Sequence, residues 1–264
     1  MKLNIRGVEI ILNVKKMKQG LIEKISKNKE LPKTMLDVYR SLGYMNYKFD
    51  CKNTHINDYE NLCLIAKSLN GLGWNPKVNK QLELFYPYFQ FNNSSGRFDF
   101  YSTFSNKECY YGTFALGFKT QELAEYAGRT FIDQYNKWLI IPKLESKLIE
   151  EVDYREIKTM SDVYKINGIN NLTTLPETKE RYYEDLTLIA KAMNGNWKPI
   201  FSDNNTPKYY PYFHLSKKFN FSDTSYDLTY ADSVCGPNLY YKTKQIAEYA
   251  GKKFLEQYEK IMKL

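Results

Sequence analysis

The chain has 264 residues, 43% of them hydrophobic and 16% aromatic, and this content of apolar side chains excludes an intrinsically disordered protein. No stretch approaches the roughly 20 consecutive apolar residues of a membrane-spanning helix, so we expect no membrane partner. The net charge is +8, but residues 1–29 alone hold eight Lys and Arg against two acidic residues. The rest of the chain is therefore close to neutral, which argues against a surface that neutralises many phosphates of a nucleic-acid duplex.

Residues 1–29 form a basic N-terminal arm that has no counterpart elsewhere in the sequence. Alternating apolar residues over 3–14, with Gly7 at the bend, predict a strand or hairpin, and a lysine-rich helix is predicted to follow it through about Lys27. Six lysines of the arm are candidates for a tether or for contacts to nucleic-acid phosphates: Lys15, Lys16, Lys18, Lys24, Lys27 and Lys29.

Three blocks of sequence after the arm occur twice in the same order. Lys-Thr-Met-x-Asp-Val-Tyr begins at Lys33 and at Lys158, Tyr-Pro-Tyr-Phe begins at Tyr86 and at Tyr210, and Lys-Thr-x-x-x-Ala-Glu-Tyr-Ala-Gly begins at Lys119 and at Lys242. The spacing between the copies, 125, 124 and 123 residues, hardly changes, so we interpret the pattern as a tandem duplication. The predicted division is repeat 1 at 30–142, a linker at 143–154 and repeat 2 at 155–264.

Each repeat shows the same order of predicted elements. Helical periodicity and glycine stops predict a short helix, then an amphipathic helix, and alternating aromatic residues predict three strands before a closing helix. In repeat 1 these elements are expected at 34–42, 58–70, 85–91, 97–104, 109–119 and 121–138, and in repeat 2 at 159–166, 179–194, 208–215, 219–221 with 226–230, 239–242 and 244–262. The expected fold is α+β, two tandem α-α-β-β-β-α units in which helices cover a small antiparallel sheet.

Small residues recur on one face of each closing helix, at Ala124, Ala127 and Gly128 and again at Ala247, Ala250 and Gly251. We interpret them as packing residues that let the helix approach the sheet closely. Thr120 and Thr243 are expected to cap these helices, and Asp37 and Asp162 are expected at the starts of the first helices.

Aromatic residues form the most prominent duplicated set of candidate binding residues: Trp74, Tyr86 and Tyr88 in repeat 1, and Trp197, Tyr210 and Tyr212 in repeat 2. Such residues fill cores, form protein interfaces or stack on unpaired bases, and we keep all three interpretations open. Pro87 and Pro211 lie within the same motif and indicate a strand edge or a bulge.

Lys119 and Lys242, which precede the closing helices, are further candidate binding residues. Glu125 and Glu248 lie one turn into those helices, so each lysine and glutamate could share a ligand. The alternative is that the glutamates lie on a solvated helix face.

Catalytic chemistry finds little support in the sequence. The two histidines, His55 and His214, occupy unrelated positions in the two repeats, and Cys51-x-x-x-His55 with Cys63 matches no standard zinc spacing. No phosphate loop, dinucleotide fingerprint or serine-nucleophile motif occurs. We therefore expect no catalytic residue, no metal and no cofactor. The four cysteines are divided three to one between the repeats, which favours free thiols in a non-secreted protein.

The motif order Trp-x-Pro, Lys-Tyr-Tyr-Pro-Tyr-Phe and Lys-Thr-x-x-x-Ala-Glu-Tyr-Ala-Gly-Lys-x-Phe over residues 197–254 resembles a small domain common among uncharacterised proteins of gut Bacteroidetes and their phages, including the crAss-like group. Repeat 1 follows the same motif order, with Leu-Glu-Leu-Phe in place of the residues before Tyr86 and an extra glycine loop before Trp74, so the resemblance covers the chain apart from the arm. What it implies is a phage or bacterial origin, without an activity or a set of binding residues.

The expected function is that of a non-catalytic, phage-encoded interaction protein. Two linked modules gain avidity without new chemistry, so we expect them to bind a protein partner or to self-assemble, as in a virion-associated component. One alternative is a single-stranded nucleic-acid-binding protein that uses the tyrosine-rich sheet faces and the basic arm. Another is an anti-defence protein that sequesters a small ligand between the repeats. The expected location is the bacterial host cytoplasm or the phage virion.

Overall fold

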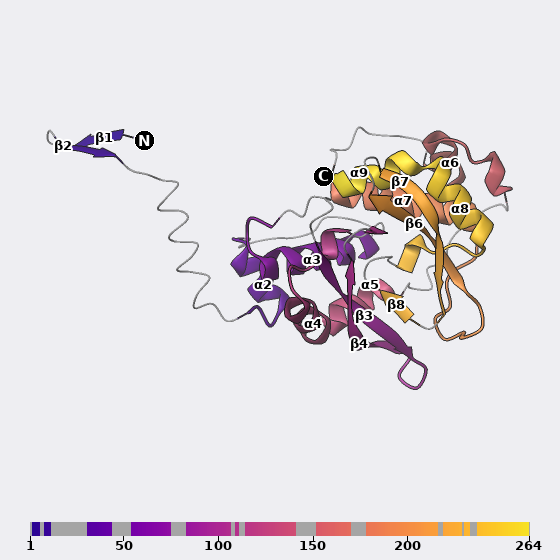
Figure 1. The fold of residues 1–264 in the computed structure, drawn as a ribbon, viewed down its shortest axis with the longest axis horizontal. Coiled ribbons are helices and arrows are strands. Elements are labelled where there is room, and N and C mark those ends of the chain that lie inside the picture. Colours follow the sequence, from indigo (N-terminus) through magenta and orange to yellow (C-terminus); the bar gives the residue numbers. More distant parts are fainter. Residues whose placement is uncertain are drawn as a thin grey trace. The chain divides into compact units, whose positions relative to one another are not determined.

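The computed structural model divides into two compact units, Met1–Pro32 and Lys33–Leu264 (Figure 1). It describes residues 2–5, 8–11, 31–43, 54–74, 83–106, 109–110, 114–140, 152–169, 178–215, 219–228, 230–232 and 237–263. In the first unit β1 (Lys2–Ile5) pairs with the antiparallel β2 (Val8–Ile11), which confirms the predicted hairpin. The predicted lysine-rich helix and the six lysines of the arm lie outside the described residues.

The second unit begins each of its halves, residues 33–140 and 152–263, with a short helix and a longer one. These helices are α2 (Met35–Ser41), α3 (Thr54–Asn70), α6 (Met160–Ile166) and α7 (Lys179–Asn194). Both short helices start with a capping box: the Asp37 N–H donates to the Thr34 hydroxyl while the Asp37 carboxylate accepts from the Thr34 N–H, and Thr159 pairs with Asp162 in the same way. The prediction that both aspartates start helices is confirmed.

Two long antiparallel hairpins follow these helices, so the chain has the predicted mixed α+β composition. They are formed by β3 (Leu84–Asn92) with β4 (Arg97–Asn106), and by β6 (Lys208–Leu215) with β7 (Phe219–Asp227). The register of each hairpin shifts once, between Tyr88 and Phe89 and between Tyr212 and Phe213, so a bulge lies just after each proline, as predicted.

Pro87 has no N–H to donate, but its position in β3 means that no hydrogen bond between β3 and β4 is lost. The neighbouring residue Phe85 exchanges two backbone hydrogen bonds with Phe118, on the edge of β3 that faces away from β4. Because backbone groups alternate along a strand, Pro87 faces that same edge, and its missing N–H removes nothing from the hairpin ladder. Tyr209 and Tyr241 form the same bridge beside Pro211.

The third strand of each half is shorter than predicted and pairs with the other half. β5 (Cys109–Tyr110) pairs with β6, and β8 (Tyr230–Asp232) pairs with β3, which makes the sheet orders β4-β3-β8 and β5-β6-β7. The prediction of three strands from one repeat in each sheet is therefore wrong, because alternation indicates an extended backbone but not its neighbour. In the described parts of the predicted strands 109–119 and 239–242, the 3-10 helices η1 (Phe114–Leu116) and η3 (Pro237–Leu239) and the single bridges at Phe118 and Tyr241 stand in place of continuous strands.

Each predicted closing helix is divided in two at a phenylalanine. The pairs are α4 (Gln121–Thr130) with α5 (Ile132–Leu139), and α8 (Lys244–Lys253) with α9 (Leu255–Lys263). Phe131 and Phe254 both leave helical geometry, with ψ angles of 27° and 29°. Both side chains are buried, and this turn keeps all four helices against the hairpins. The predicted threonine caps at Thr120 and Thr243 are confirmed.

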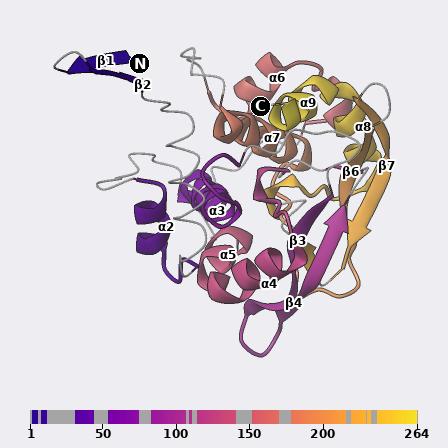
Figure 2. The same ribbon diagram turned by 60° about the vertical axis from the view of Figure 1, so that its left-hand side comes forward.

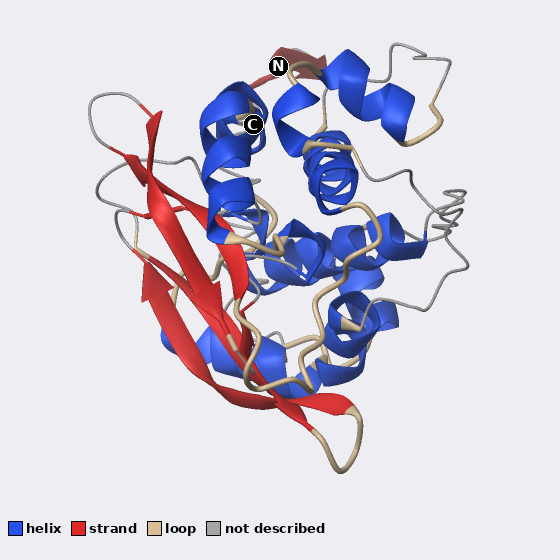
Figure 3. Ribbon diagram, turned by 90° about the vertical axis from the view of Figure 1, so that its right-hand side faces the viewer, coloured by secondary structure: helices blue, strands red, loops and turns tan. Residues whose placement is uncertain are grey.

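The predicted small residues bring α4 and α8 onto the hairpins. A Cβ atom at Gly128 would lie 2.9 Å from the Pro87 Cβ, and one at Gly251 would lie 2.7 Å from the Pro211 Cβ. Figure 3 shows the strands along one side of this unit with helices packed against them. On the outer side of the strands Tyr101 and Tyr226 are each 56% exposed.

A buried asparagine at the end of each long helix binds the chain just before the closing helices. The Asn70 side-chain amide donates to the Gly117 carbonyl and accepts from the Lys119 N–H, and the Asn194 amide makes the corresponding bonds to Tyr240 and Lys242. The two long helices α3 and α7 also contact one another (Figure 2). No helix among the described residues has the length and apolar character needed to cross a bilayer.

Candidate functional site

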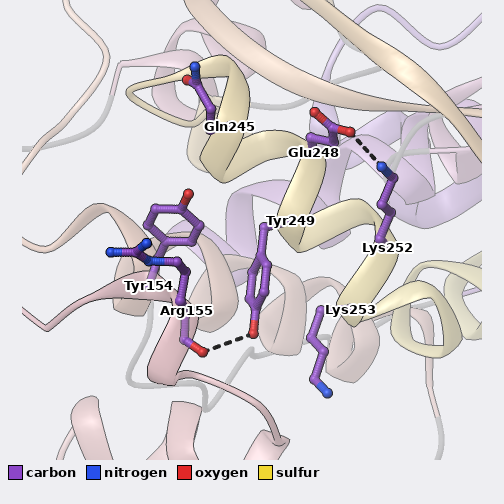
Figure 4. A pocket seen from close by; sticks show the side chains of 7 residues that line it. All are labelled: Tyr154, Arg155, Gln245, Glu248, Tyr249, Lys252 and Lys253. Carbon is purple, nitrogen blue, oxygen red and sulfur yellow. Dashed lines mark hydrogen bonds and ion pairs between the residues drawn. The ribbon is translucent and has the colours of Figure 1, made fainter.

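A groove with a volume of about 540 Å³ lies between the 3-10 helix η2 (Tyr154–Glu156) and the outer face of α8 (Figure 4). Its α8 residues follow one another at spacings of three, one, three and one, which places them on a single helix face. The groove is lined by Tyr154, Arg155, Gln245, Glu248, Tyr249, Lys252 and Lys253.

Tyr249 of α8 holds η2 against this helix through hydrogen bonds and a ring contact. Its hydroxyl lies 3.2 Å from the carbonyl oxygens of both Arg155 and Ile157 and donates to them. Its ring meets that of Tyr154 edge to face, with centroids 5.4 Å apart. Burial, with the nearby Glu156 carboxylate, raises the pKa of Tyr249, so the hydroxyl stays a donor at neutral pH. The two tyrosines therefore form a fixed aromatic floor.

The groove is lined by three cationic side chains, Arg155, Lys252 and Lys253, and by one carboxylate, that of Glu248. Arg155 forms a bidentate pair with Asp153, whose pKa is lowered by these hydrogen bonds, and Lys252 pairs with Glu248. Lys253 has no ion-pair partner among the described residues. Because the paired side chains are well exposed, solvent screens these bonds, and an anionic ligand can compete for the same cations.

The groove continues along α8 into a second hollow of about 520 Å³. Tyr154 and Gln245 line both, and Lys242 with Thr243 adds a cation and the N-terminus of α8 at the far end. The 10 residues of α8 correspond to a length of about 15 Å, which is the reach of four or five extended residues. The combined surface thus has the dimensions of a short extended peptide.

The aromatic residues predicted as candidate binding residues are divided between core and surface. Tyr86 and Tyr210 are only 1% and 6% exposed, which places their rings in the core. Three others are partly buried and pack against the core: Trp74, Trp197 and Tyr212. Tyr88 is half-buried, and its ring meets that of Tyr101 edge to face, with centroids 6.2 Å apart.

The two candidate lysines have different surroundings. Lys242 lines the second hollow, whereas the Lys119 ammonium donates to the Asn70 carbonyl and lies 5.1 Å from the centre of the Trp74 ring. Glu125 and Glu248 each pair with a cation one turn further along their helices, at Arg129 and Lys252. This geometry fits the solvated helix face that we considered as the alternative.

Sequence reasoning missed Tyr154 and Arg155, which supply one wall of the groove. Both lie at the predicted boundary between linker and repeat 2, where no motif distinguishes them. The sequence signal that could have led to them is Tyr249, because it belongs to the repeated Ala-Glu-Tyr-Ala-Gly motif. Its ring contacts Tyr154, a residue outside its own helix.

The described residues include no group of three or more His, Cys, Asp or Glu that could hold a metal ion, and the side chains of Cys51, His55 and His214 lie outside them. The groove offers aromatic rings, ammonium and guanidinium groups, and amide donors, which are chemically suited to binding. In comparisons with known proteins, no family model, curated protein or solved structure matches this chain.

Proposed function

We propose that this protein is a non-catalytic, phage-encoded interaction protein, built from two tandem copies of one module, that binds a protein partner. The observation that supports this best is the continuous surface along α8, with a tyrosine floor and cations at both ends. We propose that this surface holds an extended acidic segment of the partner, in the bacterial host cytoplasm or in the virion.

The chemistry of the groove favours a polypeptide. Half-buried tyrosines provide apolar contact area at low cost in side-chain entropy, as aromatic residues do at many protein interfaces. Lys242 and Lys253 lie at opposite ends of α8, so acidic residues a few positions apart in an extended segment would each find a cation.

A single-stranded nucleic acid is the less favoured ligand. Base stacking needs accessible aromatic faces, and the rings of Tyr86 and Tyr210 lie in the core.

The test is selection of six-residue peptides from a random library on the full-length protein, followed by affinity measurement for the enriched peptides. We expect enrichment of peptides with two acidic residues, and a loss of affinity of tenfold or more in the Lys253→Glu variant. The matched control is Thr130→Glu, which places the same charge at the corresponding position of α4 and should leave binding unchanged. Equal binding by both variants, or binding of a single-stranded oligonucleotide but of no peptide, would refute the proposal.

A further inference from the structure

A separate cavity of about 410 Å³ lies where α3 meets the N-terminus of α7, and it shares no lining residue with the groove on α8. Cavities that hold small molecules measure roughly 300 to 1,000 Å³, so this one has the size for a single small ligand. Because the cavity lies between the two halves of the chain, both halves supply its lining.

Four charged side chains line the cavity, and their charges cancel. Glu60 and Lys67 come from α3, and Lys179 and Glu180 are the first two residues of α7. All four are half-buried. A ligand with a net charge would leave this lining unbalanced, whereas a net-neutral ligand that carries one charge of each sign would not.

Two of these charged groups, one of each sign, are unpaired. Among the described residues, neither the Lys67 ammonium nor the Glu180 carboxylate forms a hydrogen bond or an ion pair. By contrast Arg181, the next residue of α7, pairs with both Glu184 and Asp185. A half-buried charge gives up part of its hydration, so a ligand that supplies the opposite charge offsets this cost.

The charges of both signs lie around the same part of the cavity, next to Cys63. Burial is the largest cause that raises the pKa of the Cys63 thiol; Glu180 and Glu60 raise it further, whereas Lys179 lowers it. Cys63 follows Glu60 by three positions, on the same face of α3. The raised pKa disfavours the thiolate that nucleophilic chemistry needs, so the cavity is suited to holding a ligand without reacting with it.

The cavity also has an apolar wall. Leu64, Leu72 and Ala115 supply aliphatic surface. The Leu72 side chain is 56% exposed, so an apolar group bound here would cover surface that is now open to solvent.

We propose that the cavity between α3 and α7 binds a free amino acid with an aliphatic side chain, which goes beyond the binding of a protein partner on α8. The carboxylate of the amino acid pairs with Lys67, its ammonium pairs with Glu180, and its side chain packs against Leu64 and Leu72. A zwitterion supplies the one charge of each sign that the unpaired groups lack.

The corresponding positions of the other half do not repeat this combination. Counted back from the asparagines that end the two long helices, Lys67 corresponds to Lys191 of α7, but Glu180 corresponds to Ile56 of α3. Ile56 is buried and carries no charge. We therefore expect one amino acid per chain.

The experiment is isothermal titration of the full-length protein with L-leucine and with three compounds that each lack one part of it. Isoamylamine lacks the carboxylate, 4-methylpentanoate lacks the ammonium, and glycine lacks the side chain. We expect saturable binding of one L-leucine per chain and binding of the other three that is weaker by about tenfold or more, since each loses a charged pair or the apolar contact.

The variants Lys67→Gln and Glu180→Gln should each weaken L-leucine binding about tenfold, because each removes one charge from the pairing. Both side chains are half-buried, so both variants should fold, and thermal unfolding checks this. The matched control Lys191→Gln and the groove variant Lys253→Glu should bind L-leucine as the wild type does, since neither residue lines this cavity. Because Lys253→Glu affects the α8 surface alone, the two proposals can fail separately. Absence of saturable binding, equal affinity for 4-methylpentanoate, or equal losses in Lys67→Gln and Lys191→Gln would overturn the proposal.

Discussion

Tyr59 of α3 stacks on Tyr183 of α7, with ring centroids 4.0 Å apart and planes inclined by 15°. The two residues correspond in sequence, because each precedes by the same number of positions the asparagine that ends its helix. A contact between corresponding residues is what an approximate two-fold relation between the two helices produces. The stack is fully buried, and the Tyr183 hydroxyl accepts a hydrogen bond of 3.0 Å from the Trp138 Nε1–H.

The stack should contribute strongly to stability. Tyr59→Ala and Tyr183→Ala should each lower the free energy of unfolding by about 3 to 5 kcal/mol, because each leaves a large cavity between the helices. Tyr183→Phe should cost about 1 to 3 kcal/mol, because it removes the acceptor of the Trp138 bond. Urea denaturation measures these changes, with Tyr101→Ala on the exposed face of β4 as the control. If the Tyr59→Ala variant is as stable as this control, the stack contributes little.

The elements of the second unit could be predicted from the sequence because their signals are local. Helix α7 has the predicted bounds 179–194, and β6 has the predicted bounds 208–215. The partners of the short strands, β6 for β5 and β3 for β8, could not be predicted, since strand alternation carries no information about a partner far along the chain. The break at Phe131 was missed for a related reason, because a helical pattern continues on both sides of it.

The candidate site could be predicted only in part. Lys242 was among the candidate binding residues, and it lines the surface along α8. Tyr154 and Arg155 carry no local signal, because they become a wall of the groove only when η2 lies against α8. The cavity of about 410 Å³ beside α3 depends likewise on the approach of Lys179 from the other half of the chain.

Because β8 pairs with β3 and β5 pairs with β6, a substitution in one half of the chain should change the stability of backbone hydrogen bonds in the other half. Proline at Ala231 should disturb the pairing of β8 with Phe89 of β3, because proline fixes the backbone and removes a donor. We expect faster hydrogen exchange at the amides of residues 88–90, measured by NMR or mass spectrometry. Exchange at Phe213, which pairs with β5 in the other sheet, should stay unchanged and serves as the internal control. Unchanged protection at residues 88–90 would mean that β8 does not support β3.

The glycines of α4 and α8 should not tolerate a methyl group. Gly128→Ala and Gly251→Ala should each lower stability by about 1 to 3 kcal/mol through overpacking, although alanine is the better helix former. The added Cβ would overlap the Phe100 ring in the first case and would lie 2.5 Å from the Phe221 Cδ2 in the second. Thermal unfolding measures the effect, and Gly73→Ala, whose Cβ meets nothing within 4 Å, is the control. Increased stability in both helix variants would show that the helices can move away from the hairpins.

The capping boxes of α2 and α6 predict a loss of stability in acid. Hydrogen bonds from Thr34 and Thr159 lower the pKa values of Asp37 and Asp162 below the ordinary value for an aspartate. Such a carboxyl binds fewer protons in the folded chain than in the unfolded chain. Its contribution is therefore complete above the unfolded-state pKa of about 4, and it disappears as the pH falls through the lower folded-state pKa.

The test of this acid sensitivity is an NMR titration of the aspartate carboxyl groups in the wild type and in the double variant Thr34→Ala/Thr159→Ala. We expect the pKa values of Asp37 and Asp162 to rise in the variant, and the loss of stability between pH 5 and pH 3 to become smaller, because the folded and unfolded pKa values then approach one another. Asp203 also has a lowered pKa, with Thr206 as the first cause, and it should titrate identically in both proteins. Unchanged pKa values of Asp37 and Asp162 in the variant would show that their carboxylates depend on the backbone N–H groups at the helix starts and not on the threonine hydroxyls.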